Sequence, residues 1–491
     1  MTCPHPRRWL VVLMLVTAGA VCRPAEAQRL TIAGDRFAVD GAPRFLTFIS
    51  YFGVMEIDDV DEDLAFLKNA GFDGVRIWPN WRDGPPLMRS DGTLIATAIE
   101  RLHRVLDSAR AHRLVVDVTF TAEEIPGLDA PQYLRAVTAA VEELKPYDNL
   151  LVDIHNERDV HGPFGRRLAA DDVTSIAAAV KAADPNRIVT ASNSPNTSPE
   201  SAAQFTVDAG LDVTAYHEDR GANWYKAEQI ERVVTALKRN GRPAYLQEPT
   251  RFPFPSTDRS DYFRIARMNA KRAGAAAWCF HTELGFDVRD TTFKRRLAAR
   301  VQPEWSFVSE LVARIHLRTS DGMHYLVAEG GGGGAVLADR RFPGPWETLT
   351  FTSIDGGPVF AGDRVSLGAS DGHFFRAEAG GGGALTATAE AVGAWETFVV
   401  ETNHAGPIAD GDQIVLRTDT DPPWYITADQ SGGASVAVVG HAAGPWETFE
   451  VIVAAAASEL RLRSPDLTGI GRFDADCRRA GRLGIAGDDQ K

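Results

Sequence analysis

Cysteine, long apolar runs and basic charge are all scarce in this chain. Of its 491 residues only four are cysteines, and two of these lie within the first 27 residues. The other two, Cys279 and Cys477, are too few for a disulfide framework, and whether they pair stays open. No run beyond residue 27 is apolar for long enough to span a bilayer, so membrane insertion is not expected. No cluster of metal-ligand residues is recognisable either, and neither a metal nor a cofactor is predicted.

Basic residues are outnumbered by acidic ones, and the formal charge of the whole chain is −14. Such acidity argues against nucleic acid as a partner and, more weakly, against polyanionic substrates. We expect the protein to be a monomer.

The first 27 residues have the three parts of a secretory signal peptide. Arg7 and Arg8 precede an apolar stretch from Trp9 to Val21, and Ala25-Glu26-Ala27 provides the small residues of a cleavage site. The apolar stretch is too short for a membrane-spanning helix. We therefore expect residues 1–27 to be removed before Gln28 and the protein to be secreted or periplasmic, with a charge of about −16 after cleavage.

Residues 28–314 alternate between apolar strands and amphipathic helices. Eight strands are predicted in this region, over residues 45–51, 74–78, 114–120, 150–157, 188–192, 211–217, 244–248 and 275–280. This number and rhythm predict an α/β fold of the (β/α)8 (TIM) barrel type. A doubly wound open sheet would show the same alternation, but the glycine-rich first turn that such a sheet usually carries is missing after Tyr51.

The remainder of the chain repeats itself. The motif at residues 344–349, Gly-Pro-Trp-Glu-Thr-Leu, recurs in similar form at 393–398 and at 444–449. Three copies of a unit with short strands predict a threefold all-β domain over residues 315–455. These units resemble the fascin-like β-trefoil, and Trp346, Trp395 and Trp446 are predicted to fill its core. Residues 456–491 form a C-terminal tail whose start resembles an incomplete fourth repeat, and whether the domain binds glycan stays open.

Two glutamates lie at the ends of predicted barrel strands. Glu157 ends the fourth strand and Glu248 ends the seventh. Because the last side chain of each barrel strand reaches the mouth where active sites are built, the two carboxylates are expected to meet there. A pair of carboxylates is the chemical requirement of glycoside hydrolysis. For each glutamate taken alone, a solvated rim charge or an ion-pair partner is the alternative interpretation.

Further residues in the barrel region resemble clan A glycoside hydrolases, with the closest likeness to the cellulase-like family 5. The likeness covers the whole barrel region. It is carried by the entry hairpin at residues 37–45 and by residues at strand ends, namely Arg76 within Val75-Arg76-Ile77, Asn156-Glu157, His217, Glu248 and Trp278.

The resemblance implies a secreted retaining β-glycosidase that acts on a polysaccharide of the β-glucan or β-mannan type. In that reaction Glu157 would be the acid/base and Glu248 the nucleophile, with their carboxyl groups roughly 5–5.5 Å apart. Arg76 would keep Glu248 ionised, and Asn156 would bind the sugar 2-hydroxyl. Trp278 would offer an apolar face to the sugar ring, and His217 would complete the substrate site.

Two positions depart from the clan's usual pattern. The third strand ends in Thr119-Phe120-Thr121, where many members carry a histidine. The sixth ends in His217-Glu218-Asp219 in place of His-x-Tyr, so Glu248 lacks its usual tyrosine donor unless Tyr216 or Tyr245 replaces it. These departures support an alternative hypothesis, a catalytically inactive glycan-binding or adhesion protein built on a glycosidase scaffold.

Overall fold

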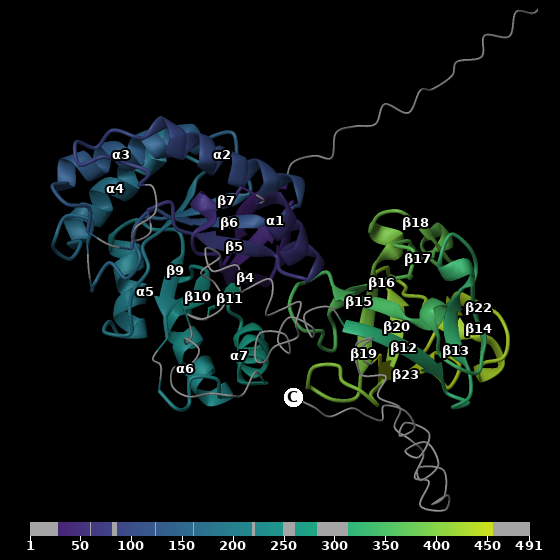
Figure 1. The fold of residues 1–491 in the computed structure, drawn as a ribbon. Helices are drawn as coiled ribbons and strands as arrows, with labels where there is room; N and C mark the ends of the chain where they lie inside the picture. Colours follow the sequence, from purple (N-terminus) through teal and green to yellow (C-terminus); the bar gives the residue numbers. More distant parts are fainter. Residues whose placement is uncertain are drawn as a thin grey trace, which may run out of the picture.

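The computed structural model describes residues 28–58, 60–80, 86–122, 124–160, 162–218, 221–248, 261–281 and 313–454. They form two domains, an α/β domain followed by an all-β domain (Figure 1). The predicted signal peptide, the tail at 456–491 and Cys477 lie outside the described residues. Cys279, the other cysteine of the predicted mature chain, is buried.

Eight parallel strands in consecutive chain order form the centre of the first domain. The sheet closes where Asn193, just after the fifth barrel strand, bridges to Tyr216 on the sixth. This confirms the predicted (β/α)8 barrel and all eight predicted strands. Their bounds are β4 (Leu46–Ser50), β5 (Gly74–Ile77), β6 (Val115–Thr119), β7 (Leu150–Asp153), β8 (Ile188–Thr190), β9 (Thr214–His217), β10 (Ala244–Glu248) and β11 (Ala277–Phe280).

Helices follow the barrel strands and surround them (Figure 1). Their apolar faces pack on the outward side chains of the strands in one large core cluster. Among the described residues no helix has both the length and the apolar character needed to cross a membrane. The helices are α1 (Val60–Asn69), α2 (Ala96–Ala111), α3 (Ala130–Leu144), α4 (Ala170–Ala183), α5 (Pro199–Asp208), α6 (Ala227–Leu237) and α7 (Asp261–Arg272), with short 3-10 turns η1 (Val54–Glu56) and η2 (Lys238–Asn240).

Side chains inside the barrel change from apolar to polar along the strands. At the N-terminal end, Phe48, Val115, Leu151 and Tyr245 form an apolar cluster. A small antiparallel sheet supplies Phe37 to this cluster and closes that end; its strands are β1 (Leu30–Ala33), β2 (Arg36–Val39) and β3 (Ala42–Arg44). Towards the C-terminal end the inward side chains are polar and still fully buried, among them Arg76, Asp117, Asp153 and Gln247.

The second domain is an antiparallel β barrel built from three similar units. Six strands pair in a closed ring, β12–β15–β16–β19–β20–β23 and back to β12, and three hairpins, β13–β14, β17–β18 and β21–β22, accompany them. The bounds are β12 (Ala313–Thr319), β13 (Tyr325–Ala328), β14 (Val336–Arg340), β15 (Leu349–Ser353), β16 (Arg364–Gly368), β17 (Phe374–Ala377), β18 (Gly383–Ala389), β19 (Phe398–Thr402), β20 (Gln413–Thr418), β21 (Tyr425–Ala428), β22 (Val436–Gly440) and β23 (Thr448–Val453). The assignment to fascin-like trefoils stays a prediction.

The repeated tryptophans do not fill the core of this domain, so that prediction is wrong. Trp346, Trp395 and Trp446 are 44%, 40% and 46% exposed. The core position belongs instead to the apolar residue that ends each motif, Leu349, Phe398 or Phe449.

The motif itself explains why the tryptophan is outside. The Glu347 carboxylate accepts the Gly344 N–H at 2.7 Å, and the Thr348 hydroxyl donates to the Gly344 carbonyl at 2.8 Å. Glu396 and Thr397 make the same two bonds to Gly393. Because the glutamate turns inward to close this short turn, the tryptophan beside it faces outward.

The second domain packs against the N-terminal end of the barrel. The Phe45 N–H, at the start of the first barrel strand, donates to the Asp355 carbonyl at 2.8 Å. Lys271, in the last turn of α7, pairs with Asp363 at 2.5 Å and donates to the Pro358 carbonyl at 2.7 Å. Since α7 leads into the start of β11, these contacts lie at the end of the barrel opposite to the strand ends that carry Glu157 and Glu248.

Candidate active site

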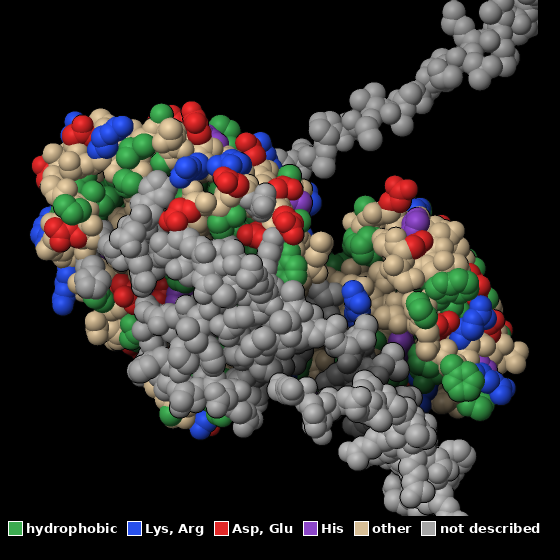
Figure 2. Space-filling model, viewed as in Figure 1, with side chains coloured by type: hydrophobic (Ala, Val, Ile, Leu, Met, Phe, Trp, Pro, Cys, Tyr) green, Lys and Arg blue, Asp and Glu red, His purple; other side chains and the backbone are tan. Residues whose placement is uncertain are grey.

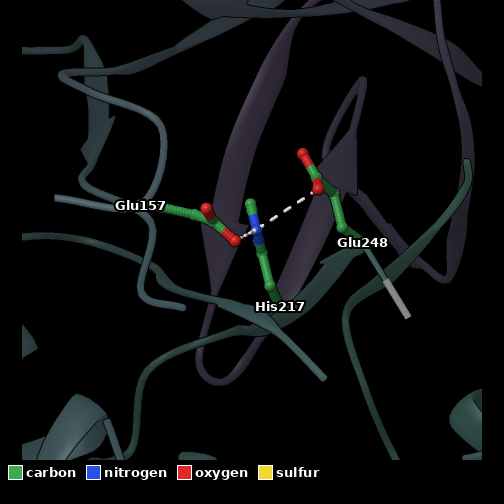
Figure 3. Close-up of side chains that lie close together, drawn as sticks. All are labelled: Glu157, His217 and Glu248. Carbon is green, nitrogen blue, oxygen red and sulfur yellow. Dashed lines mark hydrogen bonds and ion pairs between the residues drawn. The ribbon is translucent and has the colours of Figure 1, made fainter. Parts of the chain in front are cut away.

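The ends of β7, β9 and β10 bring Glu157, His217 and Glu248 together (Figure 3). The His217 Nδ1 atom lies 3.0 Å from Glu157 Oε1 and 3.4 Å from Glu248 Oε2. One nitrogen or oxygen atom from each of the three side chains lies within 4.8 Å of the other two. One imidazole edge therefore lies between two carboxylates that come from strands far apart in the sequence.

A bulge in β10 aims Glu248 into the barrel. The pairing of β10 with β9 shifts by one residue between Leu246 and Glu248. Gln247 also points inward, because its amide donates to Asp117 at 2.8 Å. Without the bulge the two consecutive side chains would face opposite sides of the sheet, so the extra residue is what allows both to reach the interior.

Glu157 is held in an uncommon backbone conformation just beyond β7. Its φ angle is 48°, in the left-handed region that costs a non-glycine residue about 1–2 kcal/mol. The surroundings fix it: the Glu157 N–H donates to the Ser192 hydroxyl at 3.0 Å, and the Asn156 N–H donates to the Thr121 carbonyl at 3.0 Å. Strain of this kind is typical of residues whose side chains must be aimed at a site.

Arg76 connects most of the predicted site residues. From β5, its guanidinium donates to Glu248 at 2.7 Å and to the Asn156 side-chain oxygen at 2.7 Å. The same group lies 4.5 Å from the centre of the Trp78 ring. Burial opposes its charge, but the carboxylates of Glu248, Asp117 and Asp153 more than compensate and raise the pKa of Arg76. The buried guanidinium thus contacts the Glu248 carboxylate directly, and that it keeps this carboxylate ionised stays a prediction.

Two buried aspartates lie beneath the predicted site. Asp117 and Asp153 face Arg76 at 3.4 and 3.3 Å, and both are fully buried. Burial raises the pKa of Asp117 well above its usual range, Arg76 opposes this rise, and Asp153 adds to it. One arginine thus faces three carboxyl groups, and the raised pKa of Asp117 relieves the excess negative charge. Sequence reasoning missed both aspartates, although each stands out as a charged residue within an otherwise apolar strand.

The two departures from the clan pattern have local explanations. Thr119, at the end of the third barrel strand, accepts a hydrogen bond from Arg76 Nε at 3.0 Å. On the sixth strand, the Tyr216 hydroxyl donates to the Thr197 carbonyl at 3.0 Å. Tyr245 packs against Phe37 and Phe48 at the closed end of the barrel. These contacts direct both tyrosines away from the role of donor to Glu248 that the sequence left open.

Trp278 does not lie where the sequence prediction placed it. It is fully buried, pairs in register with Leu246 and belongs with it to the layer between strands and helices. It therefore faces away from the barrel interior and offers no face to a sugar in this structure. The inward residue at the end of this strand is His281, whose Nδ1 lies 2.8 Å from the Ser50 hydroxyl and whose Nε2 lies 3.7 Å from Glu248. Sequence reasoning missed His281, although alternation along β11 indicates it.

The cluster of Glu157, His217 and Glu248 also has the spacing of three ligands to a cation. A hydrogen bond between His217 Nδ1 and Glu157 Oε1 already joins two of these three side chains. The site contains two carboxylates, an imidazole that lies between them and a buried guanidinium. Such a set is able to transfer a proton and to present an ionised nucleophile.

No protein-family model matches the chain, and no curated protein matches it. Solved structures are similar in fold. An endo-1,4-β-mannanase from Rhizomucor miehei is 14% identical, with 51% of this chain and 90% of that chain covered and a TM-score of 0.40. An endo-1,4-β-mannanase from Eisenia fetida is 17% identical, with 53% of this chain and 91% of that chain covered and a TM-score of 0.41. An exo-β-1,4-mannosidase from Opitutaceae bacterium strain TAV5 is 17% identical, with 57% of this chain and 58% of that chain covered and a TM-score of 0.42.

Proposed function

We propose that this protein is a secreted retaining β-glycosidase that hydrolyses a polysaccharide of the β-mannan or β-glucan type. The observation that carries the proposal is the approach of Glu157 and Glu248, whose nearest ligand oxygens lie within 4.8 Å of each other. Carboxyl groups about 5–5.5 Å apart suit a double displacement, whereas inverting enzymes separate them by roughly 6.5–9.5 Å to admit a water molecule.

In the first step Glu248 would attack the anomeric carbon. Its carboxylate accepts a hydrogen bond from Arg76, which stabilises the ionised form that a nucleophile needs. Glu157 would donate its proton to the leaving oxygen as the glycosidic bond breaks. Asn156 is fixed by its own hydrogen bond from Arg76, so its amide N–H2 group would be left to donate to a sugar hydroxyl.

In the second step water would replace Glu248 at the anomeric carbon. Glu157, now ionised, would remove a proton from that water as the glycosyl–enzyme bond breaks. The His217 ring, between the two carboxylates, supports this exchange because it offers a hydrogen bond to whichever oxygen carries more negative charge. Two inversions at the same carbon retain the β configuration of the product.

The test is hydrolysis by purified protein of aryl β-mannoside, aryl β-glucoside, soluble β-mannan and soluble β-glucan. We expect Glu157→Gln and Glu248→Gln each to lower kcat/KM for the glycans by at least about 10³-fold, since each removes a group that acts on the reacting atoms. With a dinitrophenyl leaving group, which needs no protonation, Glu157→Gln should keep much more of its glycosylation rate than Glu248→Gln.

Glu200→Gln is the matched control, because Glu200 is an exposed glutamate in the first turn of α5. Proton NMR of the first product gives the stereochemistry: the β anomer is expected, and the α anomer would exclude retention. Full activity in either site variant would refute the assignment. Retention of wild-type protein on a glycan column with no product formed would instead support the inactive, glycan-binding alternative.

A further inference from the structure

The three units of the β domain present the same tryptophan to solvent. Trp346, Trp395 and Trp446 are each exposed by two-fifths or more, whereas Trp78, Trp224 and Trp278 in the barrel are buried. In the first two motifs the buried Glu and the Thr close the turn through Gly344 and Gly393, and in the third Thr448 makes the same bond to the Gly444 carbonyl. These hydrogen bonds therefore explain the Gly, Glu and Thr positions of the repeat, and they involve no atom of the exposed indole.

Each of these tryptophans lies where one unit meets the next. At the first junction, a side chain on Gly331 would lie 3.1 Å from the Trp346 ring and 2.7 Å from the Ser370 hydroxyl. The neighbouring Gly332 lies against the carboxylate of Asp371, which also accepts from His373 Nδ1 at 2.8 Å. An indole from the first unit and an Asp–His pair from the second thus flank one glycine turn.

The junction between the third and first units repeats this arrangement. Ser320 donates to the Pro445 carbonyl next to Trp446, and the Asp321 N–H donates to the Ser431 carbonyl. Asp321 also pairs with His324, and Gly433 lies against that imidazole. The pKa of Asp321 is lowered to about 2 by hydrogen bonds that outweigh its burial, so its carboxylate is an ionised acceptor.

The junction between the second and third units is a variant of the other two. Gly380 lies against Trp395, as Gly331 does against Trp346. The position of the Asp–His pair is taken by Trp424, which lies against Gly381 and 4.4 Å from the His441 ring. The Arg376 guanidinium lies over the Trp395 ring, 4.6 Å from its centre, and Trp395 is still 40% exposed.

We propose that these junctions are saccharide-binding sites, in which the exposed indole stacks on the apolar face of a sugar ring. An indole combines a flat apolar surface with an N–H donor, and in two of the junctions an Asp–His pair from the neighbouring unit flanks the glycine turn and would bond the hydroxyls of the ring. The charge of the domain indicates a neutral glycan as the ligand. Residues 313–454 contain 18 acidic residues, seven Arg and no Lys, which gives a net charge of −11. Such a surface disfavours nucleic acid, sulfated glycans and anionic lipid.

The arrangement suggests weak sites that act together. The tryptophans lie in separate units, and hydrophobic side chains on the face seen in Figure 2 are patches among polar ones rather than one continuous apolar surface. Individually shallow sites become effective when an insoluble polymer engages several at once. The choice of β-mannan and β-glucan as the polymers rests on the proposed function, whereas binding to them does not require the barrel to be catalytically active.

The experiment measures depletion of full-length protein from solution by insoluble β-1,4-mannan and by cellulose. All variants carry Glu157→Gln and Glu248→Gln, so that binding is scored whether or not the barrel is catalytically active. We expect the triple variant Trp346→Ala, Trp395→Ala, Trp446→Ala to lower the apparent association constant by at least about tenfold, and each single variant to lower it less. A triple Trp→Phe variant keeps a flat ring and should retain binding within about threefold.

Phe342→Ala is the matched control, because Phe342 is an aromatic residue of the same domain, 85% exposed and outside the motif. It should bind as the parent does. The proposal would be overturned if the folded Trp→Ala variant bound as tightly as its parent, or if the parent bound neither polymer. It would also be overturned if the Trp→Phe variant lost binding as fully as the Trp→Ala variant, or if the tryptophans were required for retention on heparin or on phosphatidylserine vesicles instead.

Discussion

The interiors of the two domains differ in what they bury. Towards the C-terminal ends of its strands the α/β barrel encloses charged or titratable side chains that are at most 2% exposed: Arg76, Asp117, Asp153, His217, Glu248 and His281. In the β domain the buried charged side chains are only partly sealed, Glu347, Glu396 and Glu447 at 5–9% exposed, and its other buried polar residues are Ser and Thr. Its buried acids, such as Glu347 and Glu396, lie in surface turns, where each carboxylate accepts a backbone N–H three residues before it.

This difference distinguishes buried charged side chains that stabilise the fold from buried charged side chains that the fold does not require. A barrel interior filled with branched apolar side chains is a stable solution, so a buried cluster of charges is not required to close it. Taking such charges out of water costs several kcal/mol per ion, and replacing a buried ion pair by apolar residues is often neutral or stabilising. The polar end of this barrel is therefore best explained by chemistry, and the acids of the β domain by local structure.

The largest test of this comparison removes the central cation of the barrel. Arg76→Met leaves Asp117, Asp153 and Glu248 facing one another without compensation, and we expect the barrel to lose about 3–5 kcal/mol of stability. Arg364→Met in the β domain removes the cation from a partly exposed pair with Asp355, and we expect a loss of about 1 kcal/mol or less. Hydrogen exchange followed by mass spectrometry resolves the two domains in one experiment.

The comparison between the domains would fail if Arg76→Met and Arg364→Met lowered the stability of their domains by the same amount. A triple variant with Asp117→Asn and Asp153→Asn added to Arg76→Met provides the control. If uncompensated negative charge is the cause, the triple variant should recover most of the stability that Arg76→Met loses.

The sequence was sufficient for the fold because the signals for it are local and repeated. Eight apolar runs with helical spacing between them predict the barrel, and each run corresponds to one strand of the structure. The motif around Trp346 likewise predicts a domain of three units. The orientation of that tryptophan could not be read in the same way, because it depends on whether Glu347 turns inward to bond Gly344, and hydropathy favours the opposite answer.

The sequence predicted the position of those site residues whose place depends only on the strand that carries them. Glu157, Asn156, His217, Glu248 and Arg76 do lie together, linked by the hydrogen bonds of Arg76 and His217. Trp278 was misplaced because its direction depends on strand register: alternation along β11 sends Trp278 outward and His281 inward. The bulge that turns both Gln247 and Glu248 inward also could not be predicted, since it arises from the pairing of β10 with β9.

A second test uses pH and a buried carboxyl group that follows His217. Glu218 is 1% exposed, and none of the described residues hydrogen-bonds to its carboxyl oxygens. Burial raises the pKa of Glu218 to about 8. In the unfolded chain a glutamate titrates near 4.3, so between roughly pH 4.5 and 8 the folded protein holds a proton that the unfolded chain has released. Stability from this group is complete below that window and is lost as pH rises to about 8.

Glu218→Gln, a neutral side chain of the same shape, should remove this dependence. Relative to the variant, the wild type should lose up to about 1.4 kcal/mol for each pH unit across the window. Urea unfolding of both proteins at several values between pH 5 and pH 8 measures the difference. Parallel stability curves for the two proteins would show that the barrel does not hold a neutral, unpartnered carboxyl group, and would weaken the contrast with the partnered acids of the β domain.

The smallest test concerns those partnered acids. Glu396→Ala removes the acceptor of the Gly393 N–H, and we expect the β domain to lose about 1–2 kcal/mol, the usual cost of a lost capping interaction. Glu390→Ala, at an exposed position in the same unit, should change stability by about 0.5 kcal/mol or less. Faster hydrogen exchange should appear in β19 and β20 and leave β4 to β11 unchanged. Acceleration in the barrel as well would mean that the two domains unfold as one unit through the Lys271–Asp363 contact, and that turn acids in one domain also stabilise the site in the other.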